Sequence, residues 1–309
     1  MVDLSIIIVS WNVASLLRAC LRSIYSSPIG SYTLEVIVID SASSDDSVAL
    51  VRSEFPQVKL VPQVENIGFS RSNNVGLELA SGRYLFLLNP DTELVGDVLV
   101  QLLTYMDAHL TVGIIGPHTL NTDGTTQSTR RRFPSLAVGF IGSTWLQPLA
   151  PKNLLQHYYA ADLADEDISA IDWVQGSALL ARRDVYTQIG GLDAGYVMYS
   201  EEMDWCKRAK LAGWEVIYYG KAEIIHHGGK SSEQVTARKH IHFQTSKLRY
   251  FRKFHGWLPA QVLRLFLLLN YLWQIIIEAL KGLLGHKRAL RQERVQAYWQ
   301  VVRSGLKVN

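Results

Sequence analysis

The stretches Ser5-Ile-Ile-Ile-Val-Ser10 and Leu34-Glu-Val-Ile-Val-Ile-Asp40 decide the fold class of this chain. Both are short apolar runs rich in β-branched residues, a pattern typical of strands buried on both faces of a parallel sheet. Between them, Leu16 to Tyr25 has the pattern of a helix. A strand, a helix and a second strand in this order predict a βαβ unit at the start of the chain.

The same alternation continues along the chain and predicts an α/β fold with a Rossmann-like, doubly wound mixed sheet. The expected elements are helices at Ser47–Glu54, Ser70–Leu79 and Ser200–Ala212, strands at Val58–Val61, Tyr84–Leu88 and Trp214–Tyr219, regular structure at Trp173–Arg182 and a turn at His226–Ser231. Residues 117–170 are expected to form loops and short elements. Ligands of such sheets bind beyond the C-terminal ends of the strands, where Asp40 and Asp91 lie.

The composition excludes several classes of protein. Of the 309 residues, 48% are hydrophobic and 19% are charged, which excludes disorder and low complexity. The two cysteines, Cys20 and Cys206, are too few for a disulfide framework and are expected to be buried thiols in a reducing, cytosolic setting. The N-terminus enters the first strand without a signal-peptide pattern, which also favours the cytosol.

The C-terminal part differs in charge from the rest. Residues 247–309 carry twelve Lys or Arg residues but only two acidic ones, Glu278 and Glu293. Within the apolar segment 262–284, Arg264 and Glu278 bracket an uncharged run of 13 residues, shorter than the roughly 20 of a spanning helix. Its polar residues fall within about a third of a helical circle, which predicts an amphipathic helix. With basic flanks, this helix is expected on an anionic membrane surface, and packing against protein is the alternative.

Two carboxylates follow predicted strands. Asp91 ends the motif Asn89-Pro-Asp91, where a carboxylate can hold a divalent cation together with diphosphate oxygens, or can simply cap a turn. Asp40 precedes a polar turn that it can cap, and it can instead accept a hydrogen bond from an imide N–H of uracil or thymine. Taken singly, both residues leave the structural and the functional interpretation open.

Further candidate residues lie in the second half of the chain. Glu201 and Glu202 stand in the first turn of a predicted helix with Ser200 as its N-cap, where they can act as a general base or only stabilise the helix. His226 and His227 are adjacent and therefore point different ways, so at most one is expected to bind a metal. The triplet Arg130 to Arg132 can bind phosphates or remain a solvated charge cluster.

The order of these motifs resembles the family 2 inverting glycosyltransferases with the A-type nucleotide-sugar fold, especially their rhamnosyltransferase-like branch. The resemblance covers residues 4 to about 235. It rests on strand-Asp40, Asn66-Ile-Gly-Phe69 with Asn73-Asn74, Asn89-Pro-Asp91, Asp172-Trp-Val-Gln-Gly176, Gly190-Gly-Leu-Asp193, Tyr199-Ser-Glu-Glu-Met-Asp204 and His226-His-Gly-Gly-Lys-Ser231.

The resemblance implies roles for individual residues. Glu202 would be the catalytic base, with Glu201 as the alternative and Asp204 as a positioning or acceptor-binding group. A divalent cation, Mg²⁺ or Mn²⁺, would bind Asp91 and His226, with His227 as the fallback, and Asn89 replaces the first Asp of the family's Asp-x-Asp motif. The implied nucleotide-sugar-binding residues are Ser10, Asn12, Asp40, Asn66, Gly68, Arg71, Asn89, Asp91, Gly176 and Ser177. Arg130, Arg132 and Trp173 are further candidates for phosphate or acceptor contacts.

The resemblance also implies an activity and a domain organisation. One sugar, preferably L-rhamnose from dTDP-rhamnose, would pass with inversion to a hydroxyl of a glycan or polyprenyl-diphosphate-linked acceptor in bacterial cell-surface polysaccharide synthesis. The alternatives are a UDP-hexose or UDP-N-acetylhexosamine donor, or a non-catalytic scaffold. Residues 1–240 would form the catalytic domain, with a nucleotide-binding half at 1–116 and an acceptor-binding half at 117–240. Residues 241–309 would form a basic tail that holds the enzyme peripherally on the inner face of the cell membrane.

Two other classes are disfavoured. A nicotinamide-dependent dehydrogenase would carry Gly-x-Gly-x-x-Gly after the first strand, where this chain has Ser10-Trp-Asn-Val-Ala-Ser15. A nucleic-acid-binding role for the basic tail is not expected, because the tail is dense in Leu and Ile and its bases are scattered.

Overall fold

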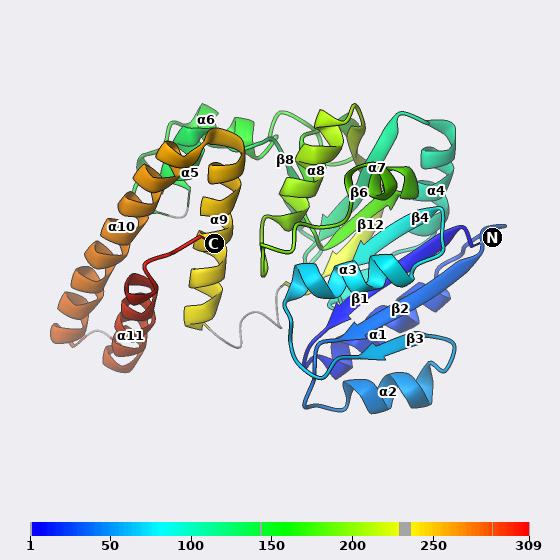
Figure 1. The fold of residues 1–309 in the computed structure, drawn as a ribbon, viewed down its shortest axis with the longest axis horizontal. Coiled ribbons are helices and arrows are strands. Elements are labelled where there is room, and N and C mark those ends of the chain that lie inside the picture. Colours follow the sequence, from blue (N-terminus) through cyan, green and yellow to red (C-terminus); the bar gives the residue numbers. More distant parts are fainter. Residues whose placement is uncertain (1, 143, 229–235, 286, 309) are drawn as a thin grey trace. The chain divides into compact units, whose positions relative to one another are not determined.

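The structure is a computed structural model that describes residues 2–142, 144–228, 236–285 and 287–308. The chain forms two compact units (Figure 1). The first comprises residues 1–133, 159–197 and 201–231, and the second comprises residues 134–158, 198–200 and 232–309. The sequence analysis divides the chain at residue 240 into a catalytic domain and a membrane-associating tail. That boundary is defined by function, so the two compact units do not test it and it stays a prediction.

A ten-stranded mixed sheet forms the centre of the first unit. Its main path has the order β3-β2-β1-β4-β11-β6-β12-β5, with β7 paired to β6 and β9 paired to β12, while β10 and β8 form a separate pair. The strands are β1 (Leu4–Ser10), β2 (Leu34–Asp40), β3 (Lys59–Pro62), β4 (Tyr84–Leu88), β5 (Thr92–Leu94), β6 (Val112–Leu120), β7 (Thr126–Gln127), β8 (Arg130–Arg131), β9 (Ile168–Ala170), β10 (Trp173–Val174), β11 (Ala178–Arg182) and β12 (Glu215–His226).

The register of the central strands gathers polar residues at one edge of the sheet. β1 is parallel to β2 and to β4, and Ser10 pairs with Asp40 at the last position of both strands. β11 runs antiparallel to β4, so its first residue, Ala178, lies opposite Leu88, the last residue of β4. The segments that follow β1, β2 and β4 and the segment that precedes β11 therefore meet at the same edge.

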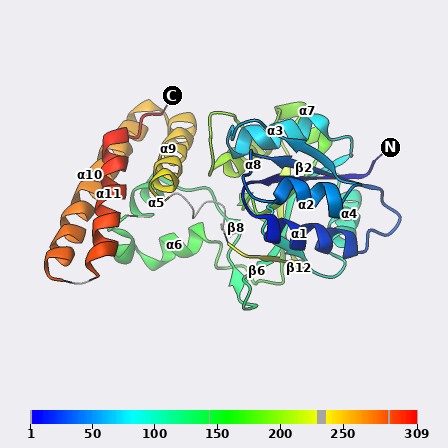
Figure 2. The same ribbon diagram turned by 90° about the horizontal axis from the view of Figure 1, so that it is seen from below.

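Helices cover both faces of this sheet. They are α1 (Ala14–Ser26), α2 (Ser47–Glu54), α3 (Phe69–Leu79), α4 (Val98–Ala108), α7 (Arg183–Ile189) and α8 (Glu201–Leu211). Figure 2 shows α1, α2 and α4 on one face and α3 and α7 on the other. Side chains of β1 alternate accordingly, since Ile6 and Ile8 belong to the core cluster beneath α1, whereas Ile7 lies against Gly76 of α3.

The predicted strands and helices of the first half are confirmed to within about two residues, and so is the predicted fold class. The sequence analysis did not predict α4, β6 or α7. The strand β12 continues to His226, beyond its predicted end at Tyr219. Of the turn predicted at His226–Ser231, residues 229–231 lie outside the described residues. Cys20 and Cys206 are buried and free, as expected, and burial raises the pKa of each thiol to about 12.

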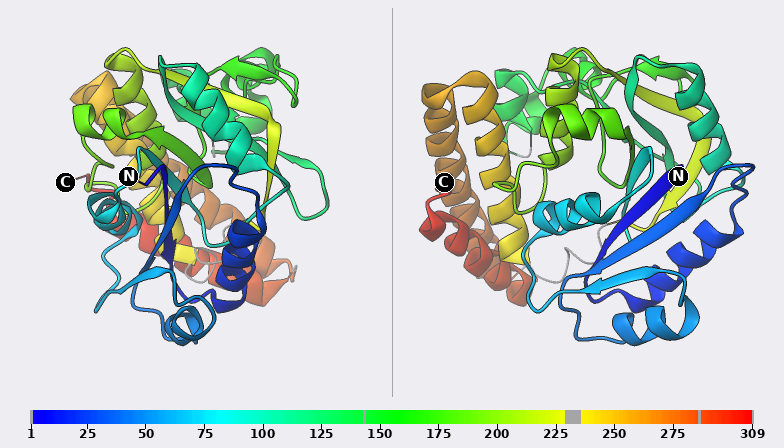
Figure 3. Two further views of the ribbon diagram at one scale, coloured as in Figure 1. Left: turned by 90° about the vertical axis from the view of Figure 1, so that its right-hand side faces the viewer. Right: turned by 45° about the vertical axis from the view of Figure 1, so that its right-hand side comes forward.

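The second unit is helical. It contains α5 (Leu136–Ile141), the 3₁₀-helix η1 (Gln147–Leu149), α6 (Lys152–Tyr158), α9 (Thr236–His255), α10 (Trp257–Leu283) and α11 (Arg288–Ser304). α10 lies alongside α9 and α11 (Figure 3). Gly256, with φ of 96°, separates α9 from α10, because a positive φ ends the first helix and allows the sharp turn into the second.

Candidate active site

The ends of β1 and β2 form the first part of the candidate site. The Asp40 carboxylate accepts a hydrogen bond from the backbone N–H of Ser43 on one oxygen, and its other oxygen, Oδ1, is buried without a partner among the described residues. The hydroxyl of Ser10, which pairs with Asp40, is also buried without a partner there. Buried polar atoms are normally satisfied, so these two atoms are placed to bind a polar ligand.

Asn12 and the start of α3 surround this edge. Asn12 has a positive φ of 53°, and its side-chain oxygen accepts a hydrogen bond from the backbone N–H of Ser44, 2.7 Å away. Gly68 precedes α3 with φ of 91°, and a Cβ there would lie 3.1 Å from Val197, so this position requires glycine. The Asn66 side-chain oxygen accepts a hydrogen bond from the Gly68 N–H, and the exposed Arg71 lies in the first turn of α3.

Asn89, Asp91 and His226 form the second part of the site. β5 pairs with the end of β12, and this pairing places Thr92 opposite His226. As a result, an Asp91 carboxylate oxygen lies 3.3 Å from His226 Nε2, and the Asn89 amide nitrogen lies 3.5 Å from the same atom. Asp91 is 4% exposed and His226 is 9% exposed, and Asn89 Oδ1 is buried without a partner among the described residues.

Gln127 fixes the orientation of His226. Its amide nitrogen donates to Asn121 Oδ1 at 2.9 Å, so its amide oxygen faces His226 Nδ1 at 2.6 Å. The oxygen can only accept, which requires the proton of a neutral His226 to lie on Nδ1. The lone pair of Nε2 then points toward Asp91 and Asn89. Gln127 could not be selected from the sequence, because its role depends on the two-residue strand β7 pairing with β6.

These residues fit a divalent cation. Asp91, His226 Nε2 and the unpartnered Asn89 Oδ1 offer one charged and two neutral ligands on one side, and diphosphate oxygens can supply the rest. No group of three or more His, Cys, Asp or Glu residues with ligand spacing occurs in the described part of the chain. His227, the fallback ligand, is engaged by Glu93 at 2.7 Å, and its backbone N–H donates to the Asp91 carbonyl oxygen.

Ser177 and Gly176 connect the second part of the site to α8. The backbone N–H of Asn89 donates to the Ser177 carbonyl, and the Ser177 hydroxyl is buried without a partner among the described residues. A Cβ at Gly176 would lie 3.5 Å from the Cβ of Glu202, so the start of α8 reaches the same edge of the sheet. The segment before β11 thus lies between the Asp91 cluster and the two glutamates.

The two adjacent glutamates have different surroundings. Burial and the charge of Glu202 raise the pKa of Glu201 well above its ordinary value, which favours the protonated form of Glu201. Burial also raises the pKa of Glu202, but hydrogen bonds from the backbone, including Gly176, and the positive charge of Arg131 oppose this shift. Glu202 Oε2 has no partner among the described residues. Glu202 therefore has the features of a general base whose pKa is raised toward the working pH.

Several other predicted residues make structural contacts. Asp204 is fully buried and pairs with Arg208 at 2.7 Å, and Arg208 in turn donates to the carbonyls of Ile189 and Gly191. This pair fits the positioning role expected for Asp204. Ser200, the expected N-cap of α8, has a positive φ of 65° instead of the extended conformation of an N-cap.

The three arginines of the triplet Arg130 to Arg132 make different contacts. Arg130 is buried and pairs with Asp165 at 2.8 Å, and Arg132 forms a bidentate pair with Asp162. Trp173 donates from its indole nitrogen to the Arg132 carbonyl. Arg131, which the sequence analysis named only as part of this triplet, is the member whose charge acts on Glu202. Contacts of Arg130, Arg132 and Trp173 with phosphate or acceptor stay predictions.

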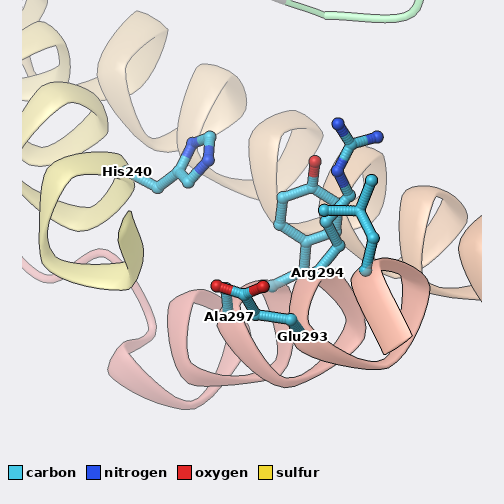
Figure 4. Close-up of a pocket in the computed structure, with 6 residues that line it drawn as sticks. His240, Glu293, Arg294 and Ala297 are labelled. Atoms are coloured by element: carbon cyan, nitrogen blue, oxygen red, sulfur yellow. The ribbon is translucent and has the colours of Figure 1, made fainter. Parts of the chain in front are cut away.

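A pocket of about 400 Å³ occurs elsewhere, in the second unit, between α9 and α11 (Figure 4). It is lined by His240, Leu290, Glu293, Arg294, Ala297 and Tyr298. Burial lowers the pKa of His240, so this side chain is neutral near pH 7. The two charged residues that remain, Glu293 and Arg294, are opposite in sign. The pocket therefore shows no preference for an anionic or a cationic ligand. None of the predicted site residues lines this pocket.

Comparison with known proteins identifies what the chain is similar to. Residues 5–172 match the family model described as glycosyl transferase family 2. The N-acetylglucosaminyl-diphospho-decaprenol L-rhamnosyltransferase of Mycobacterium tuberculosis is 27% identical over 240 residues, which cover 74% of this chain and 78% of that protein. Rhamnosyltransferase WbbL of Escherichia coli is 25% identical over 60% of this chain and 70% of its own length.

Solved structures show the same fold at low sequence identity. The mannosyltransferase PcManGT from Pyrobaculum calidifontis, in complex with GDP-Man and Mn²⁺, matches 98% of this chain and 84% of its own, with a TM-score of 0.55 and 17% identity. GalNAc-T7 with UDP, GalNAc and Mn²⁺ matches 73% of this chain with a TM-score of 0.56 and 15% identity. This chain spans 43% of the GalNAc-T7 chain.

Proposed function

This chain belongs to glycosyl transferase family 2, and from that premise we propose that it transfers L-rhamnose from dTDP-rhamnose, with inversion, to a hydroxyl of a lipid-linked saccharide. The observation that carries this proposal is the group of buried oxygens at one edge of the sheet that have no partner among the described residues. They belong to Ser10, Asp40, Asn89, Ser177 and Glu202. These atoms lie where open α/β sheets bind ligands. The site therefore has the unsatisfied polar groups that a nucleotide-sugar and an acceptor would engage.

We assign the two ends of the donor to the two parts of the site. Asp40 Oδ1 and Ser10, both buried without a partner among the described residues, would bind the base and ribose, and Asp40 would accept a hydrogen bond from the imide N–H of thymine. Asp91, His226 and Asn89 would hold Mg²⁺ or Mn²⁺ against the diphosphate. When bound, the cation supplies positive charge that stabilises the leaving diphosphate. Gly176 and Ser177, between these groups and Glu202, would face the sugar.

Glu202 would perform the proton transfer. Its carboxylate removes the proton of the acceptor hydroxyl, whose oxygen forms a bond to the anomeric carbon as the bond to the diphosphate oxygen breaks. A single displacement of this kind inverts the anomeric configuration. Arg131 favours the ionised form of Glu202. The Asp204–Arg208 pair holds the start of the loop at residues 189–191 against α8 and so keeps Glu202 in position.

The relatives support the donor and acceptor classes. Two of them are named rhamnosyltransferases, and the mycobacterial one is named for an N-acetylglucosaminyl-diphospho-decaprenol acceptor. We infer that the acceptor here is a polyprenyl-diphosphate-linked saccharide, used in cell-surface polysaccharide synthesis at the cytoplasmic side of the membrane. Another relative, 25% identical, is named hexosyltransferase Agl10. Because of this relative, a UDP-hexose or UDP-N-acetylhexosamine donor is the second candidate.

Calorimetry with a panel of donors tests the assignment of the sugar. We expect dTDP-rhamnose to bind in the presence of Mg²⁺ or Mn²⁺ and to bind weakly in EDTA, because the cation neutralises the diphosphate. UDP-glucose, UDP-galactose and UDP-N-acetylglucosamine are the comparison ligands. Preferential binding of a UDP donor would replace the rhamnose assignment, and no binding of any donor would favour a non-catalytic scaffold.

Replacing Gln127 by Leu tests how His226 is oriented toward the cation. The variant removes the acceptor for the His226 Nδ1 proton, and we expect the affinity for Mn²⁺, measured by electron paramagnetic resonance, to fall by about 10- to 100-fold. Gln127→Glu keeps an acceptor at this position and serves as the matched control. Unchanged Mn²⁺ affinity in Gln127→Leu would show that Gln127 does not orient the histidine.

A further inference from the structure

Four polar residues of α10, Arg264, Asn270, Tyr271 and Glu278, face the interior of the second unit. Glu278 accepts from Arg291 of α11 at 2.6 Å, and Arg264 donates to the carbonyl of Gly305 at 2.6 Å. Tyr271 accepts a hydrogen bond from Gln244 of α9, and Asn270 is 1% exposed. These contacts fasten the polar side of α10 to α9 and to the C-terminal helix and its end.

The opposite side of α10 is apolar and exposed. We call it the apolar stripe, and it consists of Leu258, Val262, Leu265, Leu269, Leu272, Trp273, Ile276, Leu280 and Leu283. These side chains are between 38% and 80% exposed. At 3.6 residues per turn they fall within about 100° of the helical circle and extend along about 40 Å. No polar residue lies in that sector, so the polarity of α10 is the reverse of that of a surface helix in a soluble protein.

We propose that the apolar stripe is a membrane-docking surface, on which α10 lies flat in the interface of an anionic bilayer. Charge complementarity selects this occupant. Residues 236–308 contain only two acidic side chains, Glu278 and Glu293, and the first of these is paired inside the unit. Their basic residues are Arg238, Lys239, Lys247, Arg249, Arg252, Lys253, Arg264, Lys281, Lys287, Arg288, Arg291, Arg294, Arg303 and Lys307. Of these, Lys247, Arg264 and Arg291 make contacts inside the unit, and the positive surface is formed by others.

This charge discriminates between the possible occupants of the stripe. An anionic leaflet attracts a surface of this sign, and each basic group near the lipid contributes about 1 kcal/mol to binding. A second copy of this chain would bring the same positive charge to the contact and would be repelled. The stripe therefore fits anionic lipid better than it fits self-association.

The polar contacts of α10 favour a flat orientation. α10 has 27 residues and a mean hydropathy of 1.5 over its most apolar window, which is long and apolar enough for a span by length and composition alone. However, a spanning α10 would carry Arg264, Asn270 and Glu278 into hydrocarbon or would separate them from their partners in the unit, and both are costly. Lying flat, the helix buries only its apolar stripe and keeps every polar contact.

The inference extends the proposed function, because it names the surface that would bring the enzyme to a lipid-linked acceptor. It does not depend on the donor or on catalysis. Vesicle binding can therefore be measured on the full chain without nucleotide-sugar, and donor binding can be measured without vesicles. Failure of one leaves the result of the other intact.

Flotation with two matched variants tests the docking surface. The vesicles contain phosphatidylcholine with or without phosphatidylglycerol. We expect the wild-type chain to float with the anionic vesicles, and we expect Leu265→Glu/Leu269→Glu to have a partition coefficient at least about tenfold lower. Leu110→Glu/Leu211→Glu is the control, because both leucines are 72% exposed in the first unit and the change in net charge is the same. This control is expected to float like the wild-type chain.

Tryptophan fluorescence separates insertion from adsorption. Trp273 lies in the stripe and is 51% exposed, so brominated lipids are expected to quench its emission, and Trp273→Phe is expected to remove that quenching. Equal flotation of Leu265→Glu/Leu269→Glu and the wild-type chain would overturn the proposal. So would resistance of the bound protein to alkaline carbonate, which indicates a span, or a vesicle-free dimer that the same variant dissociates.

Discussion

Replacing Glu202 by Gln is expected to lower the rate of sugar transfer by about 10²- to 10⁴-fold, because the amide cannot accept the acceptor's proton. Donor affinity, measured by calorimetry, is expected to stay within about threefold, because the substitution keeps the shape of the side chain. The raised pKa of Glu202 gives a second readout. Since the base must be ionised, transfer by the wild-type enzyme should fall as the pH drops through that raised pKa, above the ordinary glutamate value of 4.5.

Glu201→Gln discriminates between the two glutamates. Burial and the neighbouring Glu202 raise the pKa of Glu201 and so favour its protonated form, and a protonated carboxyl group is closely mimicked by an amide. We therefore expect transfer by Glu201→Gln to remain within about fivefold of the wild-type rate. A large loss in Glu201→Gln together with an active Glu202→Gln would reverse the assignment of the base.

Replacing Asp91 by Asn is expected to have the second large effect. The substitution removes the charged member of the group formed with His226 and Asn89, and we expect transfer to fall by about 10³-fold, the magnitude expected when a catalytic cation is lost. Donor binding should lose its dependence on Mn²⁺, measured by calorimetry with and without EDTA. Asp91 is 4% exposed and His226 lies 3.3 Å away, so a change in either residue acts directly on the other.

Glu93→Gln is the matched control for the Asp91 variant. Glu93 lies two residues away, and its carboxylate pairs with His227 at 2.7 Å instead of His226. The control removes the same charge from the same segment but leaves Asp91 and His226 in place, so Mn²⁺-dependent donor binding should persist. If Glu93→Gln abolished that dependence and Asp91→Asn did not, the cation would have to be assigned to the His227 side.

Local patterns in the sequence predicted which residues lie at the C-terminal ends of the parallel strands, but they did not predict all residues of the site. Ser10 and Asp40 end two apolar runs, and parallel pairing brings such ends together whatever the rest of the chain does. Asp91, Glu202 and His226 were candidates from their positions, but their roles were assigned through a family resemblance. The antiparallel pairing of β5 with β12 that joins Asp91 to His226 has no short-range signal. Gln127 was missed, and Arg131 was named only as part of a possible phosphate-binding triplet, because the contacts of both residues in the site join segments distant in sequence.

The amphipathic character of residues 262–284 was visible in the sequence, but its direction was not. A helical wheel shows that two faces differ, and it does not show which face packs inward. Here the partners of Glu278 and Arg264 lie more than ten residues away in the sequence, on α11 and at Gly305. Only the folded arrangement shows that the polar face is inside and the apolar stripe is outside.

The position of β11 has a consequence for synthesis of the chain. β11, at residues 178–182, lies between β4 and β6, although it follows both in sequence. Until a ribosome has released it, the emerging polypeptide has two open strand edges where the finished sheet is continuous, and open edges invite pairing with other nascent chains. A fragment cut at residue 172, where the family match ends, would keep those edges permanently and would be prone to aggregate.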